Sequence, residues 1–462
     1  MSQAKQYDAI IIGSGQGGNP LATYLAGKGI HTALIEKNYV GGTCLNTGCT
    51  PTKTLVASAK SAFDARRAKE YGIHAGEVSV NMKEVIARKD KLVESSRSSQ
   101  YDNLTSTENL DLIEGKARFT DNKTVAVDLN KGGEQLLQAE RIFIDTGTKT
   151  LVPPIDGLDQ VDWYDNRTIM EIDEVPEHLF IIGGGYIGLE FGQMFHRFGS
   201  KVTVFHSGGR ILENEDEDVS EEMQNILQEE GLSIITNCKI KSIKREGSEV
   251  VLVGEGKGFS EDIRCSHVLL AVGRTPNTEE LGLENTDIKT DDKGYIQVNN
   301  TLETPIEGIY AIGDVKGGLQ FTNVSYDDHI ILKKNLFENG TRSVDDRIPT
   351  YAVFTDPQLG RVGLNEAQAK EQGIDYKVAK MPMSKVARAQ EVGNTKGFMK
   401  VLVSKQDGTL LGASILGMEG CEVASALLFA MMGKLTAEQI TGTSIAHPTL
   451  MEAMNNLFGQ AV

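Results

Sequence analysis

DAIIIGSGQGG, residues 8–18 of this 462-residue chain, specifies a short apolar strand that runs directly into a glycine-rich turn. The last six residues fit the pattern G-x-G-x-x-G and open a helical run that continues through Lys28. A second strand follows at His31–Ile35 and completes a β-turn-α-β unit. Because tight glycine turns let the N–H groups of a helix N-terminus approach a pyrophosphate, this unit predicts a dinucleotide site.

The same unit occurs a second time in the chain. His178–Ile182 is again an apolar strand, GGGYIG at residues 183–188 is the turn, and a helical run continues through Phe198. The strand Lys201–Phe205 then closes the unit. A lone G-x-G-x-x-G is weak support for nucleotide binding, but two copies in complete strand-turn-helix-strand context predict two dinucleotide sites.

The residue that ends each second strand distinguishes the two ligands. Glu36 lies eighteen positions after the last glycine of the first turn, and His206 lies at the same distance from the second turn. A carboxylate at this point accepts hydrogen bonds from a ribose with free hydroxyls, as in FAD or NAD. His206, followed by Ser207 and Arg210, suits a ribose 2′-phosphate and indicates NADPH. Arg210 could also be an ordinary solvated loop charge, which leaves NADH possible.

Two cysteines stand with four residues between them in GGTCLNTGCTPTK, residues 41–53. Cys44 and Cys49 can close a small disulfide ring that opens again cheaply, although two unpaired loop cysteines are the alternative. Because the pair follows a dinucleotide turn by about thirty residues, it predicts redox chemistry in which a bound cofactor exchanges electrons with a protein disulfide. The other three cysteines are expected to be buried thiols: Cys238, Cys265 and Cys421.

Length, charge and apolar patterning narrow the class of protein. A chain of 462 residues is too long for one core and favours about three domains. The net charge of −17 argues against nucleic acid or an anionic membrane as a partner. No stretch approaches eighteen apolar residues, and Gly13 interrupts the first apolar run, so neither a membrane span nor a signal peptide is expected. With five scattered cysteines, the expected location is the cytoplasm, where a lasting disulfide is usually catalytic.

With these features the chain resembles the class I pyridine nucleotide–disulfide oxidoreductase family over essentially its full length. Beyond the cysteine segment and both turns, the resemblance rests on four segments: IFIDTG at 142–147, VGRTPN at 272–277, GIYAIGD at 308–314 and HPTLMEA at 447–453. It implies an α/β fold with two Rossmann-like domains, for FAD and NAD(P), and a C-terminal α+β dimerisation domain. The implied boundaries are a discontinuous FAD domain at 1–150 and 280–345, an NAD(P) domain at 151–279 and an interface domain at 346–462.

The resemblance also implies catalytic roles. Cys49 is the thiol next to the flavin, and Cys44 is the thiol that meets the acceptor. His447 is the acid–base that carries the proton of the Cys44 thiol, and Glu452 orients its imidazole. Since the family supplies this histidine from the partner subunit, an obligate homodimer is expected.

The same resemblance assigns the cofactor sites. The residues assigned to FAD are Gly13, Gly15, Gly18, Glu36, Lys37, Gly42, Thr43, Lys53, Gly115, Thr146, Gly147, Gly313 and Asp314. Those assigned to NADP are Gly183, Gly185, Tyr186, Gly188, Glu190, His206, Arg210, Gly273 and Arg274. Tyr186 is expected to cover the empty nicotinamide pocket, Asp314 to contact the ribityl chain, and Lys53 to lie near the flavin and pair with Glu190. Asp145 stands where the family usually has alanine and receives no role, and no residue is assigned to a metal.

Within the family, QFTNVSYDD at 320–328 resembles the mercuric-reductase-like and reactive-chlorine-resistance branch. A mercuric reductase typically adds an N-terminal metal-binding domain and a vicinal cysteine pair near its C-terminus. Neither occurs in this sequence, so efficient mercury reduction is not expected. Dihydrolipoamide dehydrogenases usually carry a carboxylate where His206 stands.

The expected activity is electron transfer from NADPH through FAD and the Cys44–Cys49 dithiol to a small acceptor, which is a disulfide, a metal ion or an oxidant. A dihydrolipoamide dehydrogenase that uses NAD is the nearest alternative. A flavin-binding redox sensor, which signals through its disulfide state, is the alternative outside enzymology. Steady NADPH consumption with an acceptor would separate the enzyme from the sensor.

Overall fold

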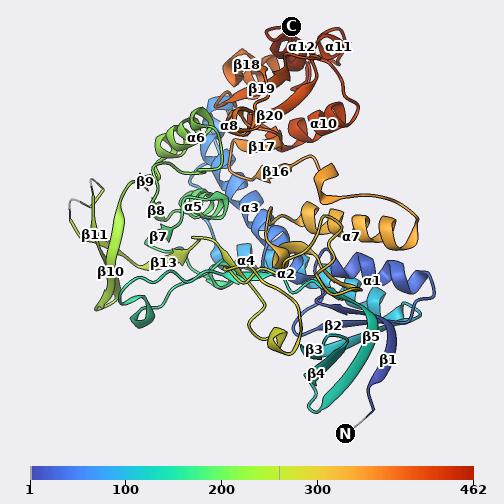
Figure 1. Ribbon diagram of the computed structural model, residues 1–462. Coiled ribbons are helices and arrows are strands. Elements are labelled where there is room, and N and C mark those ends of the chain that lie inside the picture. Colours follow the sequence, from blue (N-terminus) through green and yellow to red (C-terminus); the bar gives the residue numbers. More distant parts are fainter. Residues whose placement is uncertain (1–2, 257, 260) are drawn as a thin grey trace.

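The first glycine turn belongs to a mainly parallel sheet in the computed structural model, which describes residues 3–256, 258–259 and 261–462. β1 (Lys5–Ile12) lies between β2 (Thr32–Glu36) and β5 (Glu134–Ile144) and is parallel to both. A late strand, β15 (Ile309–Ala311), adds to β5 in the same direction. Segments from before and after the second glycine turn therefore share one sheet, at the lower right of Figure 1.

Helices cover this sheet, and an antiparallel extension continues it. α1 (Gly18–Gly27) and α7 (Thr322–Phe337) pack on one face, in a cluster that includes Phe143. β3 (Leu110–Asp121) is parallel to β2, and β4 (Thr124–Leu129) is antiparallel to β3 and β5. The turn before α1 is thereby held at the carboxyl end of β1, which is the edge where open α/β sheets bind ligands.

A second parallel sheet carries the second glycine turn, with the strand order β13-β7-β8-β9. Its strands are β7 (His178–Ile182), β8 (Lys201–Phe205), β9 (Ser233–Ile235) and β13 (His267–Leu270). The helices of this unit are α5 (Tyr186–Phe198) and α6 (Glu217–Glu230). Beside it lie three antiparallel strands, β10 (Lys239–Glu246), β11 (Glu249–Glu255) and β12 (Ile263–Cys265). A two-stranded antiparallel ladder pairs β6 (Thr148–Thr150) with β14 (Arg274–Pro276).

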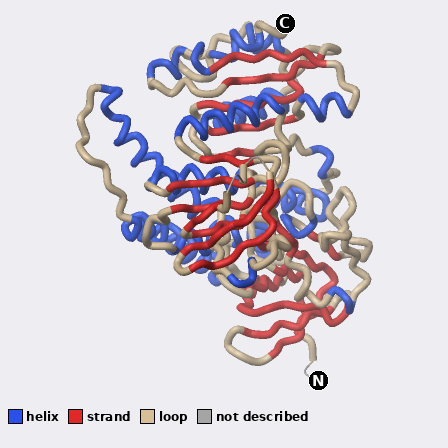
Figure 2. Tube along the Cα trace, turned by 90° about the vertical axis from the view of Figure 1, so that its left-hand side faces the viewer, coloured by secondary structure: helices blue, strands red, loops and turns tan. Residues whose placement is uncertain are grey.

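The C-terminal part is a five-stranded antiparallel sheet with the order β16-β17-β20-β19-β18. Its strands are β16 (Thr350–Val353), β17 (Gln358–Gly363), β18 (Tyr376–Pro382), β19 (Phe398–Ser404) and β20 (Leu410–Gly417). Its helices are α8 (Glu366–Glu371), α9 (Ala387–Glu391), α10 (Gly420–Met432), α11 (Ala437–Thr441) and α12 (Ala453–Phe458). This α+β part lies at the end of the molecule opposite the N-terminus (Figure 2).

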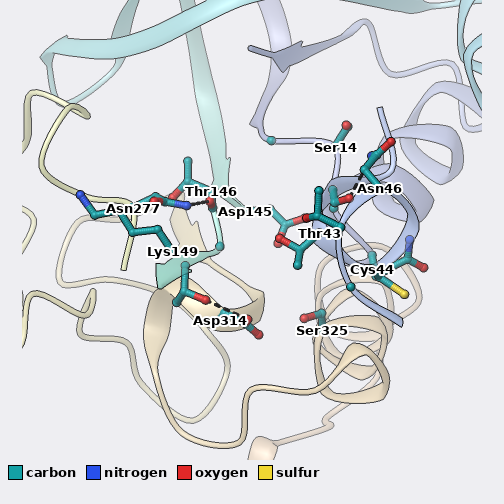
Figure 3. A pocket seen from close by; sticks show the side chains of 18 of the residues that line it. Ser14, Thr43, Cys44, Asn46, Asp145, Thr146, Lys149, Asn277, Asp314 and Ser325 are labelled. Carbon is teal, nitrogen blue, oxygen red and sulfur yellow. Dashed lines mark hydrogen bonds between the residues drawn. The ribbon is translucent and has the colours of Figure 1, made fainter. Parts of the chain in front are cut away.

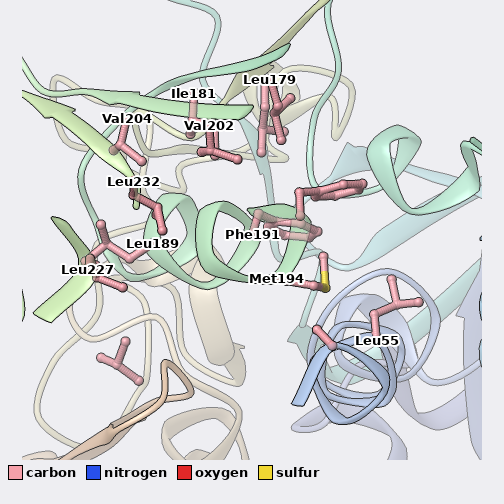
Figure 4. Packing of buried hydrophobic residues seen from close by; sticks show 14 of the residues in the cluster. Leu55, Leu179, Ile181, Leu189, Phe191, Met194, Val202, Val204, Leu227 and Leu232 are labelled. Atoms are coloured by element: carbon pink, nitrogen blue, oxygen red, sulfur yellow. The ribbon is translucent and has the colours of Figure 1, made fainter. Parts of the chain in front are cut away.

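The cysteine segment forms two helices, α2 (Gly42–Asn46) and α3 (Cys49–Arg67), and α4 (Met82–Ser106) packs beside α3. α3 also packs on α5 of the second unit. Leu55 of α3 and Met194 of α5 face each other within one buried cluster, which extends to the strands of the second sheet (Figure 4). The helix that begins at Cys49 is thus fixed against the helix that begins at the second glycine turn.

The predicted fold class is confirmed, and the two β-α-β units form where they were expected. The first helix ends at Gly27, one residue before the predicted Lys28, and β2 extends to Glu36. Cys238, Cys265 and Cys421 are buried, as expected. Among the described residues, no helix is both long and apolar enough to cross a membrane.

Candidate active site

A cavity of about 1420 Å³ joins the first glycine turn, the cysteine pair and the start of α5. Figure 3 shows Ser14 of the turn, Cys44 and Asp314 among the side chains around it. Most residues assigned to FAD line it: Gly13, Gly15, Glu36, Lys37, Gly42, Thr43, Lys53, Gly115, Thr146, Gly147 and Asp314. Both cysteines also line it. Of the residues assigned to NADP, the lining includes Tyr186, Glu190 and Arg274 but not the glycines of the second turn, His206 or Arg210.

The glycines of the first turn are required by close backbone approaches. Gly13 has φ +102°, and a Cβ there would lie 2.3 Å from the carbonyl oxygen of Asp145. A Cβ on Gly18 would lie 2.3 Å from the carbonyl oxygen of Gly13. A Cβ on Gly42, at φ +59°, would lie 2.7 Å from the Cα of Gly15. The turn and the start of α2 therefore form a cradle that side chains would fill, and the shape fits the pyrophosphate of a dinucleotide.

Polar groups at the two ends of the cavity also fit FAD. Glu36 Oε2 accepts hydrogen bonds from the backbone N (3.0 Å) and the Oγ (2.7 Å) of Ser14, so Ser14 orients the carboxylate predicted to bind the ribose. At the other end, Asp314 accepts a hydrogen bond from the Thr148 hydroxyl at 3.2 Å. Burial raises the pKa of Asp314. The buried Oγ1 of Thr146 has no hydrogen-bond partner among the residues that the structure describes, and a polar ligand atom could bind there.

The two cysteines differ in their protonation. Cys44 lies on α2, and Cys49 is the first residue of α3 and is exposed. The pKa of Cys49 is lowered to about 6, chiefly by a hydrogen bond from the Cys44 thiol, and also by the Thr322 hydroxyl, 3.2 Å from its sulfur, and by the charge of Lys53. The same thiol–thiol hydrogen bond and burial raise the pKa of Cys44. Cys49 is therefore a thiolate at neutral pH while Cys44 keeps its proton, which is the arrangement that the predicted roles require.

Lys53 and Glu190 join the two helices at the wall of the cavity. The ammonium group of Lys53 pairs with Glu190 Oε2, and Glu190 is only 3% exposed. The backbone N of Phe354 donates to the other carboxylate oxygen at 2.7 Å, and the Lys53 ammonium lies 4.6 Å from the centre of the Phe354 ring. Each oxygen of this buried carboxylate has a partner, so the ion pair fixes α3 relative to α5 beside the cysteines.

Tyr186, the expected cover of the nicotinamide pocket, belongs to a row of aromatic side chains. Its ring centre lies 5.4 Å from that of Phe321, and Phe321 stacks on Tyr351 at 5.0 Å with an interplanar angle of 3°. The Tyr351 hydroxyl hydrogen-bonds to Glu215. Because Phe321 precedes the threonine that contacts Cys49, this row connects the nicotinamide side of the cavity with the thiol side. The sequence shows three aromatics in separate segments and no signal that they meet.

His447 and Glu452 form the expected pair but lie outside the cavity. His447 Nδ1 is 2.8 Å from Glu452 Oε2 and 3.0 Å from Oε1. The His447 side chain is 69% exposed, and neither residue lines the cavity that holds Cys44. Within one chain, the imidazole is therefore not brought to the thiols.

The end of the second β-α-β unit contains a carboxylate that sequence reasoning missed. His206 Nε2 lies 3.4 Å from Glu213 Oε1. The carboxylate of Glu213 fills the space beside Gly208, where a Cβ would lie 1.7 Å from the same oxygen. Arg210 donates to the backbone carbonyls of Glu213 (3.1 Å) and Glu215 (3.2 Å). A carboxylate thus reaches the ribose-binding position from the following loop, although the strand itself ends in histidine.

Three carboxylates come together between α6 and α8: Asp216, Asp218 and Glu366. Their centre is filled by the ammonium group of Lys400, whose side chain is fully buried, at 2.7, 2.6 and 3.0 Å respectively. The cluster therefore acts as an ion-pair network that ties the second dinucleotide unit to the C-terminal sheet.

Comparisons with known proteins agree with this geometry. Residues 7–328 match the family model "Pyridine nucleotide-disulphide oxidoreductase", and residues 349–458 match the dimerisation domain of the same name. The chain is 38% identical over 458 residues to the probable pyridine nucleotide-disulfide oxidoreductase RclA of Escherichia coli, which covers 98% of this chain and 99% of that protein. It is 34% identical to a mercuric reductase of Streptomyces lividans (97% and 94% covered) and 34% identical to a dihydrolipoyl dehydrogenase of Haloferax volcanii (98% and 97% covered).

Solved structures give the same result. The Cu(II) complex of the HOCl-induced flavoprotein disulfide reductase RclA from Escherichia coli superposes with a TM-score of 0.91 at 36% identity, and covers 99% of this chain and 100% of that chain. These matches confirm the predicted resemblance and the predicted enzyme class, an FAD-dependent NAD(P)H oxidoreductase with a redox-active disulfide.

Proposed function

Because the chain belongs to the pyridine nucleotide-disulphide oxidoreductase family, we propose that it passes electrons from NADPH to a small acceptor through FAD and the Cys44–Cys49 pair. The observation that carries this proposal is that both thiols line one cavity together with the first glycine turn and with Tyr186 of the second unit. The opposite pKa shifts of Cys44 and Cys49 support it. Bound FAD supplies the electron relay between nicotinamide and thiols. The residues assigned above would hold it.

In this proposal the protein groups handle the thiol chemistry. With a disulfide acceptor, Cys44 gives up its proton and attacks one sulfur, and the other sulfur leaves as a thiol after taking a proton. Cys49 then attacks Cys44, which releases the second thiol and closes the protein disulfide. NADPH and one proton thus reduce one disulfide to two thiols. Lys53 and Thr322 stabilise the Cys49 thiolate until it attacks Cys44.

We propose a homodimer in which the partner subunit's His447 serves the Cys44 thiol. The match to a dimerisation domain supports this, as does the exposure of His447 away from the cavity of its own chain. Apolar side chains on α10 are also exposed, with Phe429 at 70% and Met432 at 65%. The domain boundaries predicted from the sequence and a cytoplasmic location remain part of this proposal. If the sites are shared, a dimer of one Cys44→Ser chain and one His447→Ala chain has one intact active site, because both substitutions fall in the other site. Since random mixing of the two chains makes about half of the dimers mixed, activity should return to about half of one active site per dimer on average.

The preference for NADPH rests on His206, Ser207 and Arg210, which could receive a 2′-phosphate. Glu213 opposes it, because its carboxylate lies beside His206 and would repel that phosphate unless the loop moves. This observation favours the second candidate, a dihydrolipoamide dehydrogenase that uses NAD. Glu213→Gln should therefore raise the affinity for NADPH more than that for NADH, and the kcat/KM values for the two nucleotides decide between the candidates.

An acceptor panel with purified protein tests the proposal. Lipoamide, small disulfides, quinones, Cu(II) and Hg(II) would each be offered with NADPH and with NADH. We expect sustained NADPH consumption with at least one acceptor, and its loss in Cys44→Ser. Equal turnover in Cys44→Ser would refute the role of the dithiol. NAD-linked oxidation of dihydrolipoamide as the fastest reaction would favour the second candidate, and the lack of turnover with any acceptor would favour a redox sensor.

A further inference from the structure

Asp145, which received no role from the sequence analysis, lies directly beneath the first glycine turn. It follows β5, the residue is 8% exposed, and it lines the cavity (Figure 3). Its Oδ2 accepts a hydrogen bond of 2.7 Å from the backbone N of Gly18, the first residue of α1. A Cβ on Gly15 would lie 2.7 Å from Oδ2, and a Cβ on Gly313 would lie 2.7 Å from Oδ1. The carboxyl group is therefore enclosed by glycines of the two segments assigned to FAD.

The second glycine turn provides an internal comparison. The backbone N of Asp145 donates to Ile12 at 2.8 Å, and in the second unit the backbone N of Ala271 donates to Ile182 at 2.7 Å. A Cβ on Gly183 would lie 2.2 Å from the Ala271 carbonyl oxygen, just as Gly13 faces that of Asp145. The two positions are equivalent, and only the first carries a carboxyl group. The backbone geometry of the turn therefore does not need it.

The groups around Asp145 are acidic. Burial raises the pKa of Asp145 most, and the charges of Asp314 after β15, Asp328 on α7 and Glu36 on β2 raise it too, whereas the hydrogen bond from the Gly18 N–H lowers it. The nearby cations serve other carboxylates, since Lys316 (3.2 Å) and Arg347 (2.6 Å) both pair with Asp328. Arg274 acts on Asp314. An ionised Asp145 would thus be a buried charge without a cation, at the place where a pyrophosphate is expected to bind.

We propose that Asp145 is a further FAD-binding residue, which presents an uncharged carboxyl group to the pyrophosphate. A protonated carboxyl can accept from the Gly18 N–H through one oxygen and donate through the other. An ionised carboxylate can only accept and would repel the phosphates. This inference rests on the proposed position of FAD at the first glycine turn.

Proton uptake on FAD binding is the consequence. Wherever Asp145 is ionised in the FAD-free protein, binding of FAD takes one proton from solvent. By linkage, the Kd for FAD then rises about tenfold per pH unit above the pKa of Asp145 in the free protein, until its pKa in the loaded protein is reached. In Asp145→Asn the amide mimics the uncharged carboxyl at every pH, so the Kd should be constant.

The test measures the Kd of full-length protein for FAD by the flavin fluorescence that is released on dilution, between about pH 5.5 and 8.5. Above the pKa of Asp145 in the FAD-free protein, wild type should lose affinity as the pH rises. Below that pKa it should bind FAD about as tightly as Asp145→Asn, which should show no slope. Asp145→Ala copies the second unit, and should bind about tenfold more weakly near pH 5.5, also without a slope. Glu36→Gln is the control for the ribose end of the site. It should weaken binding at every pH and keep a slope, displaced to lower pH because the Glu36 charge no longer raises the pKa of Asp145.

Two results would overturn the proposal: a slope that persists in Asp145→Asn, or an Asp145→Asn protein that binds FAD more tightly than wild type at every pH, because the second result means that Asp145 stays ionised beside bound FAD. If Asp145→Asn fails to fold, Asp145→Ala takes its place, and binding as tight as that of wild type near pH 5.5 would overturn the proposal. The outcome is independent of turnover. These results refute only the role of Asp145, whereas failure of wild type to bind FAD at any pH refutes the site itself.

Discussion

Replacing Lys53 by methionine tests whether its ammonium group stabilises the buried carboxylate of Glu190 and the thiolate of Cys49. The substitution keeps the apolar stem and removes the ammonium group that pairs with Glu190. Glu190 is 3% exposed, and its remaining hydrogen bond is the one from the backbone N of Phe354 at 2.7 Å. Breaking a buried ion pair from one side costs about 3–5 kcal/mol. Because the Lys53 side chain is 29% exposed and partly screened, we expect the lower end, about 3 kcal/mol.

The same substitution should change the thiols. Lys53 is one of the groups that lower the pKa of Cys49 to about 6, so in Lys53→Met the pKa should rise toward the usual 9.0. The long-wavelength absorbance of a thiolate beside the flavin, recorded against pH in the two-electron-reduced holoenzyme, reports this pKa. Since the pKa of Cys49 is lowered by folding, its thiolate adds stability that is fully present above about pH 9 and lost as the pH falls through about 6. That increment should shrink in the variant.

Urea unfolding of the holoenzyme measures the stability, with Lys53→Met/Glu190→Gln as the matched control. The double variant lacks both charges and should recover most of the loss. If Lys53→Met is as stable as wild type, or if the double variant is as unstable as the single one, Lys53 does not compensate a buried carboxylate. An unchanged midpoint of the absorbance titration would refute its effect on Cys49.

Three further predictions concern the thiols, the nucleotide and the ion-pair network. On two-electron reduction, Cys49→Ser should abolish the long-wavelength band and Cys44→Ser should retain it, because only the Cys49 thiol is ionised near neutral pH. Arg210→Ala should weaken NADPH binding by about ten- to a hundredfold and leave NADH binding unchanged, as measured by titration. Lys400→Met should cost about 3–5 kcal/mol in urea unfolding, since it leaves three carboxylates facing one another. Lys380→Met, which removes a half-exposed partner of the same cluster, should cost less than about 1 kcal/mol.

Each of these predictions has an opposite outcome that would contradict it. A band that survives in Cys49→Ser would mean that the thiol roles are exchanged. Equal losses of NADPH and NADH affinity in Arg210→Ala would mean that the guanidinium serves the loop and not a 2′-phosphate. If Lys400→Met and Lys380→Met lower the free energy of unfolding equally, the burial of Lys400 does not make its ion pairs more stabilising than those of Lys380.

The sequence predicts both dinucleotide units because their determinants are local. Strand, turn, helix and second strand follow one another without a break. The turns need glycine because a Cβ there would collide with a backbone carbonyl at the end of a neighbouring strand. Gly13 faces the carbonyl of Asp145, and Gly183 faces that of Ala271. The redox pair is equally local, since five positions separate Cys44 from Cys49.

The features that the sequence does not reveal all depend on segments that meet only in the folded chain. In the sequence, the residue at the end of the second strand, His206, distinguishes NADPH from FAD or NAD. That distinction does not take account of Glu213, whose carboxylate reaches His206 from the following loop. Phe321 and Tyr351 join Tyr186 from a different helix and a different sheet. The role of Asp145 becomes visible only when Gly18 and the surrounding carboxyl groups are placed around it.

The contact between α3 and α5 explains how one cavity can serve both halves of the reaction. α3 begins at Cys49 and α5 begins at Tyr186, so the thiol and the residue proposed to cover the nicotinamide are each the first residue of a helix. The two helices are fixed by the Lys53–Glu190 pair near the cavity and by Leu55 against Met194 further along. Any shift of one helix would therefore move the thiol relative to the nicotinamide pocket. Electron transfer between two bound groups depends on their separation, which gives this ion pair a positioning role in addition to its effect on the Cys49 thiolate.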